Sequence, residues 1–479
     1  MNGPSVHPTI AFATLGCKLN QFETDALATR FQDGGYRIVE FGEHADVIVI
    51  NSCTVTNRAD RKTRNLLYRA LRDTRDGATV DDGISSSSNA LGSLTGTDQT
   101  ALVVLTGCYV ESHQLRLHNN EQTAIVPNRQ KHALFEIVEG LRRGQMSDAD
   151  SSVFDFPVPS RVFHTRTMIK VQDGCDNLCT FCIIPSVRGR ATSRLIVDAV
   201  QSAREAIRGG AKELVLTGVN MSRYRDGAAR FPHLVREMLE IEGDFRLRIS
   251  SLEPEHRRDG LVELFDHPKM APHLHLCLQS ASDRVLRAMR RRYSYGEFVK
   301  LVETLRRRYQ HFNVTTDVIV GFPGETEEDF QQTLRSIDEL EFGHVHVFPY
   351  SERDGTPAAG MPDSVPHGVR TERAARAREV AAATKERYRR RLLGARERLL
   401  VEAIEESDTT VVRGFGAHYV PVRASVDLNR KQPSETHSMD PGSTADSPTE
   451  KPALQNDFID VRITGVSMDS EAVLIGTRV

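Results

Sequence analysis

Long apolar runs are absent from this 479-residue chain. No stretch reaches the roughly 18 apolar residues that a membrane-spanning helix needs, so we expect no membrane partner. The N-terminus lacks the basic start and the long apolar segment of a secretory signal peptide. A strong excess of one charge is missing too, because the formal net charge is −3. Any contact with nucleic acid must therefore come from local basic patches.

Cysteine is also scarce. The chain has seven, an odd number without the layout of a disulfide-rich protein. This usage is typical of a reducing compartment, and we expect a cytoplasmic protein. The length exceeds that of one ordinary hydrophobic core, so we expect about two to four domains.

Six of the cysteines form two sets of three. The first, here called the compact set, is Cys175, Cys179 and Cys182 in the run DGCDNLCTFCIIPSVRGR. Thiolates are the usual protein ligands of iron–sulfur clusters, and three of them on a short loop can wrap one corner of a cluster. A four-iron cluster held by three thiolates keeps one iron free to bind another molecule.

Two alternatives stay open for the compact set. A structural zinc site usually has a fourth Cys or His nearby, and none follows Cys182 closely. Buried or disulfide-bonded cysteines fit poorly, because three thiols this close cannot all pair with one another. The spacing favours an iron–sulfur site.

The second set, here called the dispersed set, is Cys17, Cys53 and Cys108. Each ends a β-like run, and a helical pattern follows each run. Alternation of strand and helix predicts a parallel sheet, in which ligands gather at the carboxyl ends of the strands. We therefore expect these thiols to converge on a second three-ligand site, with inert core cysteines as the alternative. Two such sites indicate that two reactants meet between two clusters.

The whole chain is expected to be α/β in class with three parts. Residues 1–155 are predicted to form a doubly wound parallel-sheet domain, in which the polar stretch 76–99 is a disordered insertion. Residues 156–391 repeat a strand–helix unit six times, which predicts an open (β/α)6 barrel with its chemistry at the carboxyl ends of the strands. Short strands in 392–479 predict a small all-β barrel, in which 431–452 is a disordered loop.

Several specific sequence motifs occur between residues 15 and 357. They are LGCKLNQFETD, INSCTVTNRADRKTR, LTGCY, VQDGCDNLCTFCIIPSVRGRATSR, LTGVN, ISSLEP, HLHLCLQS, DVIVGFPGET and VFPYSERDGTPA. Together they resemble the methylthiotransferase family of radical S-adenosylmethionine (SAM) enzymes, and the C-terminal region resembles the family's RNA-binding TRAM domain. The runs CKLNQFET and TVTNRADRKTR are most similar to the branch that modifies N6-threonylcarbamoyladenosine in tRNA.

The resemblance implies two [4Fe-4S] clusters and SAM as cofactors. The compact set would hold the cluster that binds and cleaves SAM, and the resulting 5′-deoxyadenosyl radical would remove hydrogen from an aromatic C–H. The dispersed set would hold the cluster that presents sulfur for methylation by another SAM. The implied reaction is methylthiolation at C2 of N6-threonylcarbamoyladenosine, at position 37 of a tRNA anticodon loop.

Polar residues at the ends of barrel strands are candidate SAM contacts. They are Gly218, Asn220, Ser251, Glu253, Gln279 and Asp317. The alternative for each is a strand cap or a core hydrogen bond. We expect the seventh cysteine, Cys277, to be a packed core thiol, and His275 on the same strand face to be structural. No catalytic residue is assigned beyond the cluster cysteines.

Basic residues supply candidate RNA contacts. Arg58, Arg61 and Arg64 lie on one helical face after Cys53, and we predict that they contact the anticodon loop. A solvated helix face is the alternative.

Two longer basic segments are further candidates for RNA contact. Residues 371–398 and 284–298 are predicted to be basic helices, and Tyr293 and Tyr295 in the second are predicted to be available for base stacking.

Other functions stay open from the sequence. A sibling enzyme would act on isopentenyladenosine in tRNA or on a ribosomal-protein aspartate. A non-enzymatic iron–sulfur electron carrier or RNA-binding module would not cleave SAM. We expect a monomer that works with an electron donor of unknown identity.

Overall fold

The structure is a computed structural model. It describes residues 7–76, 101–113, 122–144, 152–159, 165–255, 260–405, 410–426, 454–467 and 473–479. The predicted loop 431–452 and all but the first residue of the predicted insertion 76–99 lie outside the described residues. No described helix is long and apolar enough to cross a membrane.

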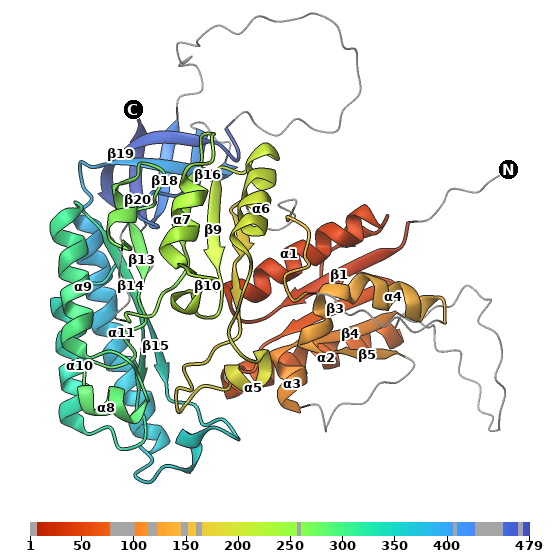
Figure 1. The fold of residues 1–479 in the computed structure, drawn as a ribbon, viewed down its shortest axis with the longest axis horizontal. Coiled ribbons are helices and arrows are strands. Elements are labelled where there is room, and N and C mark those ends of the chain that lie inside the picture. Colours follow the sequence, from red (N-terminus) through yellow and green to blue (C-terminus); the bar gives the residue numbers. More distant parts are fainter. Residues whose placement is uncertain are drawn as a thin grey trace, which may run out of the picture.

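The N-terminal part is a doubly wound α/β unit, as predicted (Figure 1). Its five strands are all parallel in the order β2-β1-β3-β4-β5. Their bounds are β1 (Thr9–Thr14), β2 (Arg37–Val39), β3 (Val47–Ser52), β4 (Leu102–Gly107) and β5 (Thr123–Val126). Helices α1 (Lys18–Asp33) and α4 (Leu134–Arg142) pack on one face, and α2 (Asn57–Asp76) and α3 (Cys108–His113) on the other.

The strand sequences explain this burial. Every residue of β3 is buried, and its run VIVINS is nearly continuous in apolar residues rather than alternating. Such a pattern is typical of a parallel strand covered on both faces. Val47 and Val49 join the core beneath α1, whereas Ile48 and Ile50 join the core beneath α2.

The central part contains six parallel strands in sequence order. They are β6 (Thr167–Lys170), β9 (Glu213–Thr217), β12 (Arg246–Ile249), β13 (His273–His275), β14 (Asn313–Val320) and β15 (His344–Pro349). They form two sheets, β12-β9-β6 and β13-β14-β15, and isolated bridges between β12 and the β13 region join the two. The predicted six strand units are therefore present, divided between two sheets.

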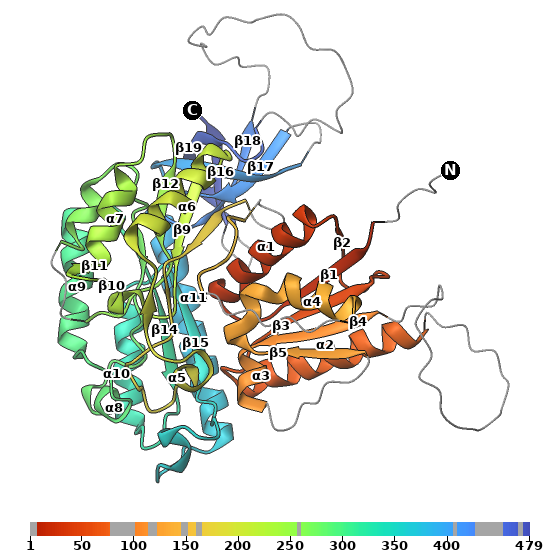
Figure 2. The ribbon, with the colours of Figure 1, turned by 45° about the vertical axis from the view of Figure 1, so that its right-hand side comes forward.

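Helices cover the outer side of these sheets, and the inner side is turned toward the N-terminal part (Figures 1 and 2). The long helices are α6 (Ile196–Arg208), α7 (Phe231–Leu239), α9 (Tyr295–Arg308), α10 (Glu327–Glu339) and α11 (His367–Arg390). The short elements are β7 (Gln172–Asp173), α5 (Ile184–Arg188), β8 (Thr192–Ser193), β10 (Arg225–Asp226), β11 (Ala229–Arg230) and α8 (Asp283–Ala288).

The C-terminal part is a small closed barrel of five strands. Its strands are β16 (Arg396–Glu405), β17 (Thr410–Phe415), β18 (Pro421–Val426), β19 (Phe458–Val466) and β20 (Leu474–Arg478). The turn between β17 and β18 reaches the central part, where Arg246 and Arg248 donate to carbonyl oxygens of residues 415–417. The barrel is thereby docked at one end of the β9–β12 sheet.

The prediction of one basic helix over 284–298 is wrong. The structure has α8 and α9 there, and Ser294 starts α9 with a reciprocal capping box with Glu297. Tyr293 is not available for base stacking either. Its side chain is buried, and its hydroxyl donates to the carbonyl oxygens of Cys277 (2.6 Å) and Leu278 (2.7 Å).

Candidate functional site

The dispersed set lies at the carboxyl edge of the N-terminal sheet. Cys17 follows β1 at the start of α1, Cys53 follows β3, and Cys108 follows β4 at the start of α3. Because β1, β3 and β4 are neighbours, the fold brings the three thiols together. Burial, with smaller contributions from the nearby Cys108 and Cys17, raises the pKa of Cys53 to about 12. Metal ligation by these thiols stays a prediction.

Glycines allow this convergence. Gly16, which precedes Cys17, has φ +104°, and a Cβ built there would lie 2.9 Å from the Cys53 Sγ. Gly107, which precedes Cys108, has φ +98°, and its Cβ would lie 2.4 Å from the carbonyl oxygen of Ser52. Only glycine fits a left-handed backbone at such close approach.

The compact set lies on the loop between β7 and α5. Burial raises the pKa of Cys182 to about 12, with smaller contributions from Cys179 and Cys175, so these thiols also lie together. Hydrogen-bond donors point at the sulfurs. The Cys175 Sγ accepts from the Asn177 backbone N–H (3.4 Å) and the Asn220 Nδ2 (3.5 Å).

An arginine supports the same set of thiols from another loop. Arg291 Nη1 donates to the Cys179 Sγ at 3.2 Å, and its Nη2 pairs with Glu253. Charged donors to sulfur favour the thiolate over the thiol, and the thiolate is the form that binds metal.

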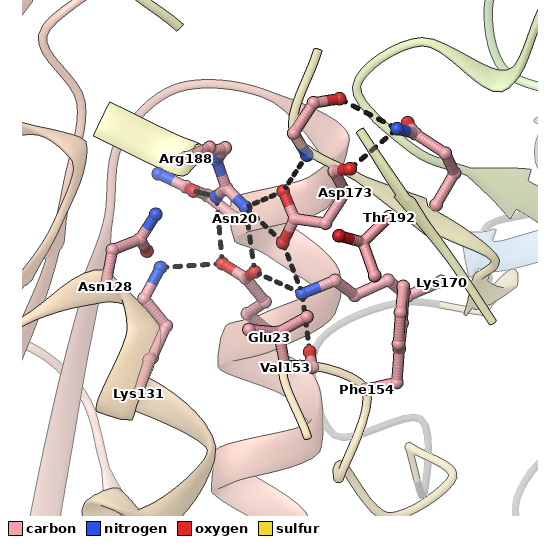
Figure 3. Close-up of polar contacts among 12 residues, drawn as sticks. Asn20, Glu23, Asn128, Lys131, Val153, Phe154, Lys170, Asp173, Arg188 and Thr192 are labelled. Carbon is pink, nitrogen blue, oxygen red and sulfur yellow. Dashed lines mark hydrogen bonds and ion pairs between the residues drawn. The ribbon is translucent and has the colours of Figure 1, made fainter. Parts of the chain in front are cut away.

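A buried network of charges joins the two thiol-bearing parts (Figure 3). Arg188, at the end of α5, donates to Asn20 (2.6 Å) and Glu23 (3.0 Å) on α1 and to Asp173 (3.1 Å). Two lysines complete the network. Lys131 pairs with Glu23 at 2.6 Å, and Lys170 pairs with Glu23 at 3.0 Å and with Asp173 at 2.7 Å.

This network carries an excess of positive charge beside the dispersed set. Three cations face two carboxylates, and burial alone would raise the pKa of Glu23, but Arg188, Lys131 and Lys170 hold it well below its ordinary value. The surplus acts on Cys108. Burial raises the pKa of that thiol, and Arg188 and Lys131 oppose the rise. A buried cationic surplus stabilises an anionic thiolate group.

The predicted SAM contacts differ in whether they contact or lie near the cysteines of the central part. Asn220 touches Cys175, Glu253 reaches the compact set through Arg291, and Asp317 lies close enough to Cys277 to raise the pKa of its thiol after burial does. Gly218 packs against Gln172, where a Cβ would lie 3.0 Å from the Gln172 carbonyl oxygen. Two others, Ser251 and Gln279, follow β12 and β13 without a side-chain hydrogen bond to the compact set. SAM binding by these residues stays a prediction.

The predicted RNA contacts lie on α2, which begins four residues after Cys53. Arg58, Arg61 and Arg64 are all exposed. A hydrogen bond with Tyr109, the residue after Cys108, raises the pKa of Arg64. RNA contact by these residues stays a prediction.

Comparison with known proteins identifies the family. The Radical SAM superfamily matches residues 169–337, and the Uncharacterized protein family UPF0004 matches residues 9–83. The threonylcarbamoyladenosine tRNA methylthiotransferase MtaB of Bacillus subtilis is 37% identical over 76% of this chain and 78% of its own length. The protein of the same name from Thermotoga maritima is 33% identical over 86% and 90%. The chain belongs to the radical SAM methylthiotransferase family.

Another relative in this family differs in its named product. The tRNA-2-methylthio-N(6)-dimethylallyladenosine synthase of Thermobifida fusca is 35% identical over 82% of this chain and 78% of its own length. Among solved structures, the radical SAM methyltransferase TsrM from Kitasatospora setae has a TM-score of 0.50 at 13% identity, over 74% of this chain and 77% of its own. That likeness supports the fold alone.

Membership of the radical SAM methylthiotransferases confirms that the protein is an enzyme and that SAM and [4Fe-4S] clusters are its cofactors. The thiol sets fit such clusters. Each has three cysteines free of disulfides, with cationic or hydrogen-bonding groups aimed at the sulfurs.

Sequence reasoning missed Lys18, Arg188 and Arg291, which contact or neighbour the thiols. Lys18 directly follows Cys17, and Arg188 comes six residues after Cys182, both within the family motifs given above. Their position beside the cysteines could have indicated a role near the thiols. Nothing in the sequence indicated that Arg291 reaches Cys179, which is 112 residues away.

Proposed function

We propose that this methylthiotransferase acts on tRNA and replaces the C2 hydrogen of N6-threonylcarbamoyladenosine, at position 37 of the anticodon loop, with a methylthio group. The observation that carries the proposal is the pair of three-thiol sets on facing parts of the chain, joined by Arg188. The named substrates of the Bacillus subtilis and Thermotoga maritima relatives support the choice of nucleoside.

The compact set would hold one cluster, with Cys175, Cys179 and Cys182 as ligands and SAM on its open iron. The cluster supplies the one-electron chemistry that activates an aromatic C–H, a step outside the reach of acid–base groups. Arg291 and Asn220 donate hydrogen bonds to the sulfurs. The backbone N–H of Asn220 also donates to Gln172 Oε1 (2.6 Å), which ties β7 to the end of β9.

The dispersed set would hold the second cluster, with Cys17, Cys53 and Cys108 as ligands. Arg188 lies on α5, after the compact set, and donates to Asn20 and Glu23 on α1, the helix that begins directly after Cys17. This contact fixes the two sets relative to each other. The substrate base would lie between them.

The tRNA would contact both the N-terminal part and the C-terminal barrel, which we propose is TRAM-like. Arg396 on β16 and Arg462 on β19 are exposed and directly opposite each other. Like charges placed in this way repel, and a phosphate between them would relieve the repulsion. We further propose that the enzyme acts as a cytoplasmic monomer with a separate electron donor, and that its parts divide near residues 155 and 391.

Nucleoside analysis of tRNA by mass spectrometry, with and without the gene, tests this function. Loss of the 2-methylthio form of N6-threonylcarbamoyladenosine is expected on deletion. Loss of a methylthiolated isopentenyladenosine instead would assign the substrate of the sibling branch. Methylthiolation of a ribosomal-protein aspartate, with tRNA unchanged, would reject a tRNA substrate.

A matched pair of variants tests the division of labour. Cys53→Ala is expected to abolish methylthio transfer and to leave SAM cleavage by the reduced protein largely intact. Cys179→Ala is expected to abolish both activities. Equal loss of SAM cleavage in the two variants would mean that the thiol sets are not separable as proposed.

A further inference from the structure

A polar group lies on the inner face of the β13–β14–β15 sheet, and it includes Asp317, which the sequence also offered as a SAM contact. The side chains of His275, Asp317 and His346 bring their donor atoms within 4.8 Å of one another. His275 Nε2 lies 3.3 Å from the Asp317 carboxylate, and Asp317 is directly opposite His346 across β14 and β15. On the other face of β14, Val314 and Val318 are fully buried in the hydrophobic core. The polar group therefore faces away from the helices.

This group has neighbours close to each thiol set. On one side, the pKa of Cys277 is raised first by burial and then by the charges of Asp317 and Cys179, so these three are neighbours. On the other side, Lys18 is close enough to His346 to lower the pKa of its imidazole, after burial and His275. Lys18 directly follows a cysteine of the dispersed set. A base held between the two sets would lie near this group.

Lys18 supplies a positive charge that has no anionic partner in the part of the chain that the structure describes. Its Nζ lies 5.1 Å from the centre of the Tyr419 ring. Two more cations, Arg166 and Arg248, also lie over the Tyr419 ring, but these are paired with Glu402 and Glu213. Lys18 is therefore the cation of this group that can bind an anion from outside the protein.

The same face offers a place for a flat ring. Phe348 follows His346 on β15, with ring centres 6.4 Å apart, and 42% of its surface is exposed. An exposed aromatic ring on a sheet that faces another domain is suited to stacking on a base.

We propose that Lys18 and His346 bind the carboxylate of the substituent on N6 of the substrate adenosine, that the Asp317 carboxylate, held in place by His275, accepts hydrogen bonds from its hydroxyl and urea N–H groups, and that Phe348 stacks on the base. This assignment rests on the proposed function. A threonylcarbamoyl group carries a carboxylate, a hydroxyl and an N–H, and it forms a urea with N6, whereas the dimethylallyl group named for the Thermobifida fusca relative is a hydrocarbon. An apolar substituent would leave the protein's polar groups without hydrogen-bond partners. A site of this kind discriminates strongly against a substrate that lacks the polar groups.

Two histidines and a carboxylate are also a donor set for a divalent cation. Here both ring nitrogens of His275 already have protein partners, since Nδ1 lies 3.0 Å from the Thr315 hydroxyl and Nε2 faces Asp317. His346 is in turn 3.3 Å from His344. These contacts favour a hydrogen-bonding site over a metal site.

The test is binding of two anticodon stem–loop RNAs, one with N6-threonylcarbamoyladenosine at position 37 and one with unmodified adenosine there. The protein is the full chain with reconstituted clusters and SAM. We expect Lys18→Met and His346→Gln each to lose about tenfold of the preference for the modified RNA, with affinity for the unmodified RNA unchanged. Lys18→Arg, which keeps the charge, should retain most of the preference. Lys300→Met on the exposed side of α9 is the control for loss of one positive charge, and it should behave as wild type.

An unchanged preference in both Lys18→Met and His346→Gln would overturn the inference, even if the wild type methylthiolates the modified RNA. A stoichiometric divalent ion beyond the cluster iron, lost in His346→Gln, would overturn it in favour of a metal site. Failure of the proposed function has a different signature, because the wild type itself would then leave N6-threonylcarbamoyladenosine unmodified. Since His346 is remote in sequence from every predicted cluster ligand, its variant separates substrate binding from loss of a cluster.

Discussion

At the scale of single residues, Arg188 makes the strongest link between the two thiol sets. Its side chain is 1% exposed and donates to two carboxylates, Glu23 and Asp173. Arg188→Gln would leave both with fewer partners, and removal of one member of a buried ionic network costs about 3–5 kcal/mol. Chemical denaturation should therefore show a large loss of stability. Arg190→Gln is the matched control, because that side chain is 92% exposed, and it should change stability by under about 0.5 kcal/mol. Equal losses of stability in the two variants would mean that the buried ionic network does not contribute to the stability of the fold.

Arg291 should tune the cluster on the compact set. Its guanidinium donates to the Cys179 Sγ at 3.2 Å, and hydrogen bonds and positive charge near cluster sulfurs stabilise the reduced form. Arg291→Met is therefore expected to make the reduction potential more negative. The measurement is a redox titration followed by electron paramagnetic resonance, in a background where the three dispersed cysteines are alanine. Arg292→Met, next in sequence and exposed, should leave the potential unchanged. A shift of the same size in both variants would argue against a specific contact.

The residues that the sequence revealed and those that it hid differ in kind. The cysteines could be singled out because their proposed roles depend on spacing within a loop or on position after a strand, both of which are local. Arg188 and Arg291 have partners more than 100 residues away in the sequence, so the assembled fold is needed to show what they contact. Tyr293 shows a different kind of error, a residue that was wrongly predicted to be exposed. Its polar neighbours in sequence indicated a surface residue, but the fold buries its ring.

At the scale of elements, strands β9 and β12 are joined by a buried carboxylate with two arginines. Burial alone would raise the pKa of Glu213, but Arg246 and Arg248 hold it far below its ordinary value. The stabilising charge is therefore fully present above about pH 4.5 and is lost as the pH falls toward the lowered pKa. Glu213→Gln should cost about 3–5 kcal/mol at pH 7, because both arginines lose their anion.

The pH dependence gives this prediction its control. Denaturation measured from pH 7 down to about pH 3 should show the gap between wild type and Glu213→Gln narrowing below about pH 4.5. Glu386→Gln removes the exposed pair with Arg390 on α11 and should have an effect under about 1 kcal/mol. A constant gap across the pH range would mean that Glu213 acts through packing rather than charge.

The elements themselves were largely predictable, and their assembly was less so. Runs such as ELVLTGVN and NVTTDVIVGF became β9 and β14, because their apolar residues match a buried parallel strand. The six strands fall into two sheets because β12 and the chain after it meet β13 through isolated bridges, such as that between Leu252 and Leu276, instead of a continuous ladder, and no periodicity encodes this. The basic segment 371–398 is helical to Arg390, yet Arg373 within it is buried and paired with Glu325, so part of its charge serves the fold.

At the scale of the whole molecule, the start of α2 is fixed against the central part. Arg353, which follows β15, is 6% exposed and donates to Asn57 (2.7 Å), Thr54 (2.7 Å) and Asp60 (2.7 Å). This junction lies directly after Cys53, so the exposed arginines of α2 project from a rigid region beside the place where the substrate base would lie. RNA that reaches both thiol sets would therefore pass these arginines.

Replacing Arg58, Arg61 and Arg64 together with Gln should weaken tRNA binding and reduce its dependence on salt. Each lost phosphate contact lowers the slope of log K against log salt by about 0.7–0.9. Binding is measured across a salt series with the cluster-loaded protein, and SAM cleavage without tRNA should stay at the wild-type level because none of the three touches a compact-set cysteine. The control replaces three exposed arginines elsewhere on the central part, Arg204, Arg208 and Arg307. If the control lowered the slope as much as the α2 variant, RNA attraction would come from net charge alone, and α2 would not be the contact surface.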